Sequence, residues 1–575
     1  MSKTQIESAV KLMDEGNTIP FIARYRKEVT GGLDDTILRN LEERLHYLRN
    51  LEKRKQEVLE LIAASGKLDD KQMEQMQKAL EEAKMLSEVE DLYRPYKQKR
   101  KTRASVAREK GLEPLAKFML MQKSGGDLEQ EAARYVNAEK GVEDVEQALS
   151  GAGDILAEEI SDSAQIRSRL REYLQKNAQI STTKGTKENQ IYDMYSEYSE
   201  SVRRIAPHRI LAIDRGEREE ALKVSVEIDQ QVCIGMIENQ VIHRNSPFAK
   251  ALHAVCEDSF KRLIFPSLER ELRAQLTEKA CAQAIGVFSE NLKNLLMQPP
   301  VKGCVTMGFD PAYRTGCKIA VVDETGKVLD TTVVYPTPPQ NRTEQAKQVL
   351  GSLIEKYGIT VIAIGNGTAS KESEIFVAEL LGELNPKLEH KVSYMVVSEA
   401  GASVYSASKL GAEEFPQFDV SLRSAVSIAR RLQDPLAELV EIDPKAIGVG
   451  QYQHDMPPKE MDAALGGVVE DCVNKVGVDL NTASQSLLSY VAGINAAVAK
   501  NIVLYREENG SFTKRSQLLS VSKLGKKAYE QCAGFLRVSE SENPFDHTGV
   551  HPESYEAAKQ LLTLCGYQMQ DVLSG

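Results

Sequence analysis

The sequence predicts a multidomain, mainly α-helical protein that contains one α/β domain with a mixed β-sheet. At roughly 100–200 residues per domain, its 575 residues correspond to about three to five domains. Apolar residues recur at helical spacing over most of the chain. Only between residues 302 and 434 do short apolar strands alternate with helices.

Residues 1–70 are predicted to form a helix-turn-helix-like helical region. Gly16 ends one helix, Thr18 can cap the next, and Pro20 lies in its first turn. Leucines at positions 38, 41, 45, 48 and 51 then share one face of a long helix. Small helical bundles show the same pattern, so DNA recognition and a purely structural role are both open.

Residues 71–300 are predicted to form a helical scaffold with one small β-hairpin near residues 209–243. Val224, Val226 and Ile228 alternate with polar residues, as in a strand with one buried face. A second apolar stretch at 233–236 follows a polar turn, and we expect the two stretches to pair.

A basic segment at residues 94–110 is a candidate surface for an anionic partner. It holds eight Lys and Arg residues and one Glu, whereas the whole chain has a net charge of −11. The overall charge excludes a protein that coats nucleic acid with its whole surface, but local segregation favours contact at particular places. A solvated loop explains the segment equally well. The candidate residues are Lys97, Lys99, Arg100, Lys101 and Arg103.

Composition excludes several other classes of protein. With 42% hydrophobic and 27% charged residues, the chain is neither fibrous nor disordered throughout. The eight cysteines contain no Cys-x-x-Cys pair, which argues against zinc ribbons and thioredoxin-like sites. No apolar stretch approaches the ~18 residues of a membrane span, and the N-terminus lacks a secretion signal. We therefore expect a cytoplasmic, monomeric protein with no membrane partner, cofactor or bound metal.

Residues 302–434 are predicted to form the α/β domain. Three strands come first, at 305–310, 318–323 and 328–335. Helices and strands then alternate, at 345–356, 360–364, 372–384 and 392–397, and two helices follow at about 402–414 and 420–432. Three meandering strands followed by this alternation is the order of the RNase H-like fold.

This fold raises the alternative of a metal-dependent, structure-selective nuclease. Such chemistry needs two metal ions about 3.5–4 Å apart, held by several carboxylates. Asp310 ends the first strand and Glu399 follows the last, but the final helix presents Arg423, Ser427 and Arg430 instead of a third carboxylate. We therefore expect no catalysis, with Asp310 and Glu399 as vestigial residues. Arg423 or Arg430 is expected to pair with one of them in place of the metal.

An internal repeat follows a predicted linker and helix at 435–480. Apolar residues at 488, 491, 494, 498, 502 and 505 recur thirty positions later. Asn495 matches Gly525, and both residue types tolerate a left-handed backbone. The pattern predicts a tandem helix-hairpin-helix at 481–540, and we expect a helical tail at 541–575.

Each predicted hairpin offers a phosphate site. The N–H groups at the start of its second helix lack helical acceptors, and the helix dipole adds positive potential there. Two packed hairpins with solvated lysines, in a protein-interaction scaffold, are the alternative. The candidate nucleic-acid-binding residues are Gly493, Asn495, Lys500, Lys514, Arg515, Lys523, Gly525, Lys526 and Lys527.

Several long motifs resemble the bacterial Tex family of transcription accessory proteins. They are PFIARYRKE at 20–28, DLYRPYK at 91–97, RTGCK at 314–318, GNGTAS at 365–370, SEAGASVY at 398–405 and QYQHD at 451–455. The resemblance covers nearly the whole chain.

The resemblance implies a helical scaffold that carries a YqgF/RuvC-like domain and tandem helix-hairpin-helix motifs. It also implies a protein that binds DNA or RNA and assists transcription, with RNA polymerase or ribosome-associated transcription machinery as candidate partners. A scaffold that binds proteins at RNA polymerase is the alternative. The family usually ends in an OB-fold RNA-binding domain. We expect none within residues 541–575, whether the chain is truncated or a natural short form, and therefore expect weaker single-strand RNA binding.

Overall fold

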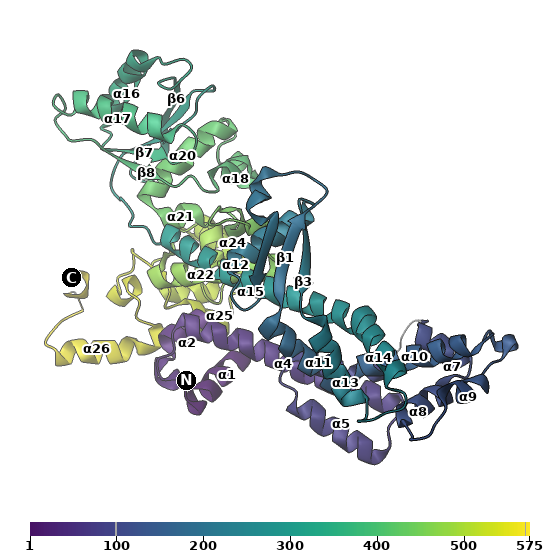
Figure 1. Cartoon of the computed structure of the whole chain (residues 1–575). Helices are drawn as coiled ribbons and strands as arrows, with labels where there is room; N and C mark the ends of the chain where they lie inside the picture. Colours follow the sequence, from purple (N-terminus) through teal and green to yellow (C-terminus); the bar gives the residue numbers. More distant parts are fainter. Residues whose placement is uncertain (98–100, 570, 575) are drawn as a thin grey trace. The chain divides into compact units, whose positions relative to one another are not determined.

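The computed structural model describes residues 1–97, 101–569 and 571–574 (Figure 1). The chain forms two compact units: Met1–Glu42 with Ile285–Gly575, called unit 1 here, and Glu43–Ala284, called unit 2. The chain passes between the units within α4 (Asp35–Ala64) and within α15 (Phe265–Leu296). Within the described residues, no helix is long and apolar enough to cross a membrane.

Unit 2 is a helical scaffold that carries a small antiparallel sheet. The strand order is β2-β1-β3, with β1 (Gln179–Lys184) in the centre, flanked by β2 (Glu197–Ser201) and β3 (Leu222–Glu227). The helices are α5 (Asp70–Glu82), α6 (Leu86–Tyr93), α7 (Arg103–Glu109), α8 (Glu113–Met121), α9 (Leu128–Ala133), α10 (Val145–Asp162), α11 (Ala164–Asn177), α12 (Pro207–Arg218), α13 (Gln230–Val241) and α14 (Ala249–Asp258).

The predicted hairpin near residues 209–243 is wrong. Val224 and Val226 lie in β3, as their alternation predicts, but the apolar stretch 233–236 lies in helix α13. β3 pairs instead with β1, where Val226 lies opposite Ile180. A short apolar run does not distinguish a strand from a buried helix segment, and the tertiary contacts decide between them. β1 and β2 also interrupt a region that reads as helical in the sequence.

Unit 1 contains the predicted α/β domain with its mixed sheet. The strand order is β6-β5-β4-β7-β8, and β4 is antiparallel to β5 and parallel to β7. The strands are β4 (Thr306–Asp310), β5 (Cys317–Val322), β6 (Val328–Val334), β7 (Val361–Gly365) and β8 (Ser393–Val397). This arrangement confirms the RNase H-like order of elements.

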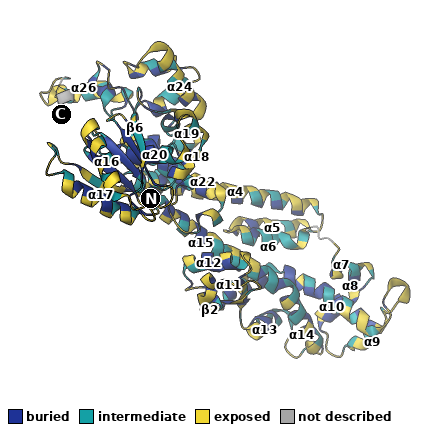
Figure 2. Ribbon diagram, turned by 90° about the horizontal axis from the view of Figure 1, so that it is seen from above, coloured by how far each residue is buried: buried dark blue, intermediate teal, exposed yellow. Residues whose placement is uncertain are grey.

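Helices cover both faces of this sheet. α16 (Thr343–Tyr357) and α17 (Ser370–Leu384) pack on one face, and α20 (Val420–Gln433) packs on the other. The central strands β4, β5 and β7 are buried, whereas the edge strands β6 and β8 are partly exposed (Figure 2). The single helix expected at 402–414 is divided into α18 (Ala402–Ala407) and α19 (Lys409–Glu414), because Ser408 is extended and caps α19.

The remaining parts of unit 1 are helical. The expected linker after residue 434 is not an extended loop: it forms α21 and two 3₁₀ turns, and it buries Leu436, Leu439 and Ile447. These helices are α1 (Lys3–Asp14), α2 (Ile19–Tyr25), α3 (Lys27–Thr30), α21 (Pro435–Leu439), α22 (Pro458–Val476), α23 (Gln485–Ser489), α24 (Ala496–Asn509), α25 (Lys526–Cys532), α26 (Tyr555–Leu564) and α27 (Asp571–Ser574).

The two hairpins repeat the same backbone hydrogen bonds thirty residues apart. Ile494 N–H donates to the Val491 carbonyl at 2.9 Å, and Leu524 N–H donates to the Val521 carbonyl at 3.1 Å. The first copy joins α23 to α24, and the second joins the 3₁₀ helix η7 (Arg515–Ser520) to α25. The internal repeat is therefore a structural repeat, although its second copy opens with a 3₁₀ helix.

The left-handed residues of the hairpins are not the predicted ones. Asn495 and Gly525 have φ of −92° and −80° and serve as N-caps. The left-handed positions lie two residues earlier, at Gly493 with φ of +78° and Lys523 with φ of +67°. The thirty-residue spacing still holds, so the error concerns only which turn residue takes the unusual backbone conformation.

Gly493→Ala should destabilise unit 1 by about 1–3 kcal/mol. The added Cβ would combine a left-handed backbone with a position 2.5 Å from Gln531 Cβ. Gly466→Ala in α22 is the matched control, since a Cβ there meets nothing within 4 Å and alanine favours a helix by about 0.5–1 kcal/mol. Urea unfolding followed by circular dichroism should show opposite shifts of the midpoint. Equal shifts would contradict the assignment of the turn.

Candidate functional site

The hairpin turns place two helix N-termini at the protein surface. In the first hairpin the Asn495 side chain accepts the Val498 N–H at 3.0 Å, while Asn495, Ala496 and Ala497 are exposed. In the second hairpin the N-cap is Gly525, which offers no side-chain acceptor. Since the first N–H groups of a helix have no acceptor within it, both turns present donors to a ligand.

Lysines surround the second turn more closely than the first. Lys523, Gly525 and Lys526 are exposed and lie within one turn of chain. Near the first turn the cation is Lys500, one helical turn into α24, and it is exposed as well. Lys514 is exposed but precedes η7 and lies nine residues before Lys523.

Lys527 is already engaged within unit 1. Its ammonium donates to the Glu15 carbonyl at the C-terminal end of α1. Gln531, one turn further along α25, accepts the Thr18 N–H at 2.9 Å and so contacts the turn between α1 and α2. An ammonium group at a helix C-terminus is favoured by the helix dipole. Lys527 therefore fixes the N-terminal helices to the second hairpin.

The prediction is wrong for Arg515. This side chain is 1% exposed, so it cannot reach a nucleic acid. Its guanidinium donates to the carbonyls of Leu536 at 2.9 Å and Val550 at 2.7 Å, and to the Tyr555 hydroxyl at 2.7 Å. It binds the C-terminal segment to the hairpins. Sequence charge counting cannot distinguish such a buried arginine from a solvated one.

The basic segment at 94–110 belongs to unit 2. Lys97, Lys101 and Arg103 are exposed there, whereas Lys99 and Arg100 lie outside the described residues. Other cations of the segment pair with acids of α10. They are Arg94, 3.3 Å from Asp162, and Arg108, 2.8 Å from Glu158. Part of the predicted surface is therefore neutralised by structural ion pairs.

The RNase H-like cleft forms where the parallel strands end. Successive residues of a strand point to opposite faces, so Gly308 and Asp310 of β4 face α20, as does Gly365 of β7. Glu399, two residues beyond β8, lies against the same edge. The sequence prediction that Asp310 and Glu399 come together is consistent with this geometry.

Gly308 allows α20 to pack closely on β4. A Cβ at this position would lie 2.1 Å from the Ala425 carbonyl. The close approach brings the Ser424 hydroxyl to Asp310, which accepts its hydrogen bond. Burial raises the pKa of Asp310, with a smaller contribution from the Glu399 charge, and the net value is about 6 against the opposing effects of Ser424 and Lys318.

Glu399 fills the turn that follows β7. A Cβ on Gly367 would lie 1.6 Å from Glu399 Oε1, and Asn366 accepts the Glu399 N–H at 3.0 Å. The glycines of this turn therefore accommodate a carboxylate, which would repel a phosphate. Among the described residues, no group of three His, Cys, Asp or Glu side chains could hold a metal ion.

The expected arginine partners of the carboxylates are wrong. Arg423 donates to the Phe415 carbonyl at 3.1 Å, and Arg430 binds Glu414 at 2.6 Å. Ser427, predicted to lie on the same helix face as Arg423 and Arg430, is buried.

Arg431 is the residue that sequence reasoning missed. Its guanidinium donates to the carbonyls of Ser398 at 2.8 Å and Ala400 at 2.7 Å, on either side of Glu399, and burial lowers its pKa to about 10. The sequence contains a signal for its burial: Arg431 continues the three-residue spacing of the apolar residues Ala425 and Ile428.

Comparisons with known proteins agree with this architecture. The model of the Tex protein YqgF-like domain matches residues 304–433, the Tex central region-like model matches 124–288, and the Tex-like N-terminal model matches 1–63. A helix-hairpin-helix motif matches 473–537, and an HHH domain matches 543–575.

Relatives match over almost the whole chain. The transcriptional accessory protein Tex of Neisseria gonorrhoeae is 46% identical over 99% of this chain and 74% of its own length. The chain belongs to the Tex family. YdcI of Bacillus subtilis is 49% identical over 100% of this chain and 79% of its own length. The human S1 RNA-binding domain-containing protein 1 is 37% identical over 98% of this chain and 62% of its own length.

Asp310→Asn should stabilise the Tex YqgF-like domain at pH 8. A raised carboxyl pKa contributes stability that is complete below the ordinary aspartate pKa of about 4 and is lost as the pH rises through about 6. Removing the buried charge should therefore gain up to about 3 kcal/mol at pH 8 and little at pH 4. Urea unfolding in EDTA at both pH values measures this.

Asp330→Asn is the control, because hydrogen bonds from Tyr357 and Lys356 lower the pKa of Asp330. It should destabilise the same domain at pH 8. A loss of stability in Asp310→Asn at pH 8 would contradict the assigned environment.

Proposed function

We propose that this chain is a nucleic-acid-binding transcription accessory protein that holds the sugar-phosphate backbone without reading base sequence. The observation that carries the proposal is the repeated hairpin, which exposes two helix N-termini thirty residues apart. Contacts from backbone N–H groups and ammonium groups to phosphates position a nucleic acid but carry no sequence information. The name of the gonococcal relative supports the role in transcription.

The cations of the interface divide unequally between the hairpins. Lys523 and Lys526 flank the second turn, whereas Lys500 alone lies near the first. Lys527 contributes to the interface only by fixing α1 beside it. We infer that the second hairpin supplies most of the electrostatic attraction and that the first supplies mainly N–H donors.

We further propose that the YqgF-like domain does not cleave nucleic acid. Two-metal hydrolysis needs several carboxylates around both ions, and α20 brings Ser424 to Asp310 instead. The buried guanidinium of Arg431 lies beside the Glu399 loop and opposes a second divalent cation there. RNA polymerase as the partner and a monomeric state are parts of the same proposal.

The affinity for nucleic acid should fall steeply with salt and depend on two lysines. The slope of log affinity against log salt is about −0.9 per phosphate neutralised on duplex DNA. Lys523→Gly with Lys526→Ala should therefore make the slope shallower by about 2. Fluorescence anisotropy on single-stranded and duplex DNA and RNA, from 50 to about 300 mM NaCl, measures the slope and the preferred ligand.

This pair of substitutions also separates binding from folding. Lys523 is left-handed, so Lys523→Gly should raise stability by about 1 kcal/mol while it weakens binding. Lys371→Ala with Lys409→Ala is the control, since these side chains are 79% and 89% exposed and lie far from the hairpins in sequence. An unchanged slope in the Lys523/Lys526 variant, or an equal change in the control, would overturn the proposal.

No metal-dependent cleavage is expected. Labelled duplex, branched and single-stranded substrates should stay intact with Mg²⁺ or Mn²⁺, because the part of the chain that the structure describes holds no cluster of three His, Cys, Asp or Glu side chains for a metal ion. Denaturing gels resolve the products. Cleavage that Asp310→Asn abolishes would establish the nuclease alternative.

A further inference from the structure

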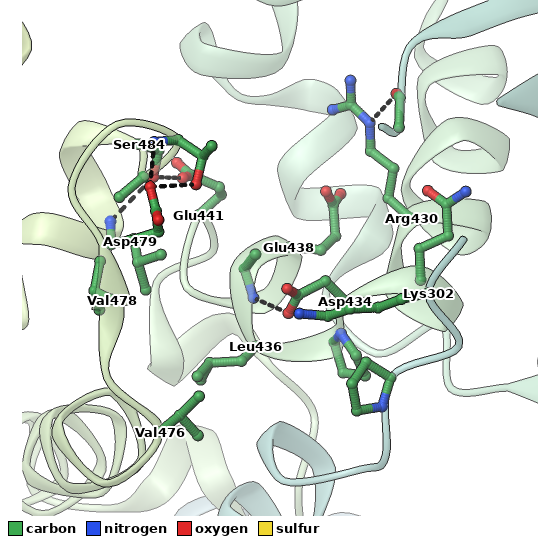
Figure 3. Close-up of a pocket in the computed structure, with 18 of the residues that line it drawn as sticks. Lys302, Arg430, Asp434, Leu436, Glu438, Glu441, Val476, Val478, Asp479 and Ser484 are labelled. Atoms are coloured by element: carbon green, nitrogen blue, oxygen red, sulfur yellow. Dashed lines mark hydrogen bonds between the residues drawn. The ribbon is translucent and has the colours of Figure 1, made fainter. Parts of the chain in front are cut away.

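A cavity of about 1130 Å³ lies within unit 1, beside the end of α20. Its lining comes from α19, α20 and α21 on one side, and from β9 (Val478–Asp479) and residues 482–487 on the other (Figure 3). Residues 296–300, Lys302, residues 324–326 and Arg537 also contribute to the lining. We call it the acidic cavity. It is separate from the hairpin turns, which contribute nothing to its lining.

The acidic cavity carries an excess of negative charge. Seven carboxylates line it, against three permanent cations, Lys302, Arg430 and Arg537. Arg430 is already paired with Glu414 at 2.6 Å and donates to the Gly326 carbonyl at 2.8 Å. A surface of this charge repels a phosphate backbone and attracts a cation.

Glu438 gives the cavity an acceptor without a donor. The residue is 7% exposed, and its Oε1 has no hydrogen-bond partner among the described residues. Glu438 is one of the lining residues, and Figure 3 shows its carboxylate between Arg430 and Asp434. A buried carboxylate oxygen without a donor is costly, so a ligand that supplies a charged N–H group would be favoured there.

The groups that surround Glu438 leave its Oε1 able to accept a hydrogen bond from a ligand. Its other hydrogen bond comes from Ser427, and Arg431 donates instead to the carbonyls of Ser398 and Ala400. Glu441, which also lines the cavity, accepts one bond from Ser484. A carboxylate has about four acceptor positions, so Glu441 can accept further donors.

We propose that the acidic cavity binds a basic peptide segment of a protein partner, with an arginine or lysine side chain reaching Glu438. Its volume exceeds the roughly 300–1,000 Å³ of small-molecule sites, which favours a peptide. Leu410, Val476 and Leu487 also line it and can pack against the aliphatic stems of such side chains.

A tryptophan reporter tests the proposal on the full chain. The sequence contains no tryptophan, so Leu410→Trp places a single fluorophore at the cavity. Titration with a six-residue peptide of alternating arginine and lysine should give a saturable change of emission that weakens with salt. Ile375→Trp, an exposed position on α17 outside the cavity, should give none. A six-residue glutamate peptide should leave both reporters unchanged.

Charge-removing variants locate the contact. In the Leu410→Trp chain, Glu438→Gln should weaken peptide binding on the order of tenfold, as expected for loss of a charge-assisted hydrogen bond. Glu441→Gln, at a less buried lining residue, should weaken it less and keeps the test valid if Glu438→Gln does not fold. Glu344→Gln with Glu379→Gln removes two charges from α16 and α17 and should have no effect.

Three results would overturn the proposal. They are a signal that does not saturate, equal affinity in the cavity variants and the α16/α17 control, and a half-maximal change of emission at lower concentration with spermine than with the peptide. The nucleic-acid salt slope of the cavity variants should match the parent chain, so failure here is distinguishable from failure of the hairpin interface.

Discussion

The surroundings of Asp310 and of Glu399 in the YqgF-like domain both depend on the close packing of α20 on the central strand, β4. Because Gly308 has no side chain, the backbone of α20 lies directly on β4. That contact sets Ser424 beside Asp310 and directs the Arg431 guanidinium to the loop around Glu399. It also places α21, and with it Glu438, at the acidic cavity. A bulkier residue at position 308 would displace all of these groups together.

The hairpins combine strain and charge at one position. Lys523 adopts a left-handed backbone that glycine adopts at no cost, and the equivalent residue of the first copy is glycine. A lysine thus lies at a position where the backbone conformation favours glycine. Such backbone strain is typical of functional sites. The neighbouring Lys527 has the opposite character, because its charge serves the packing of α1. Two lysines four residues apart therefore have different roles: Lys523 is exposed at the turn, and Lys527 holds α1.

Prediction from the sequence succeeded where a local pattern of residues is compatible with only one structure. The order of strands and helices in residues 302–434 and the thirty-residue repeat both follow from apolar spacing. It failed where two structures share a pattern, as in the apolar stretch of α13, which was expected to be a strand. It failed also for charged residues, since Arg515 and Arg431 are buried and donate to main-chain carbonyls.

The sequence by itself determined the family from its motifs. It also determined the mainly helical fold class with one mixed-sheet domain and the spacing of the hairpins, because these depend on periodic burial along the chain. The tertiary structure alone decided which charges face solvent, which pair with acids and which cap carbonyl groups. The physical reason is that the environment of a side chain is set by groups distant in the chain: Glu15 meets Lys527, and Ala425 meets Gly308. No local pattern of residues encodes those encounters.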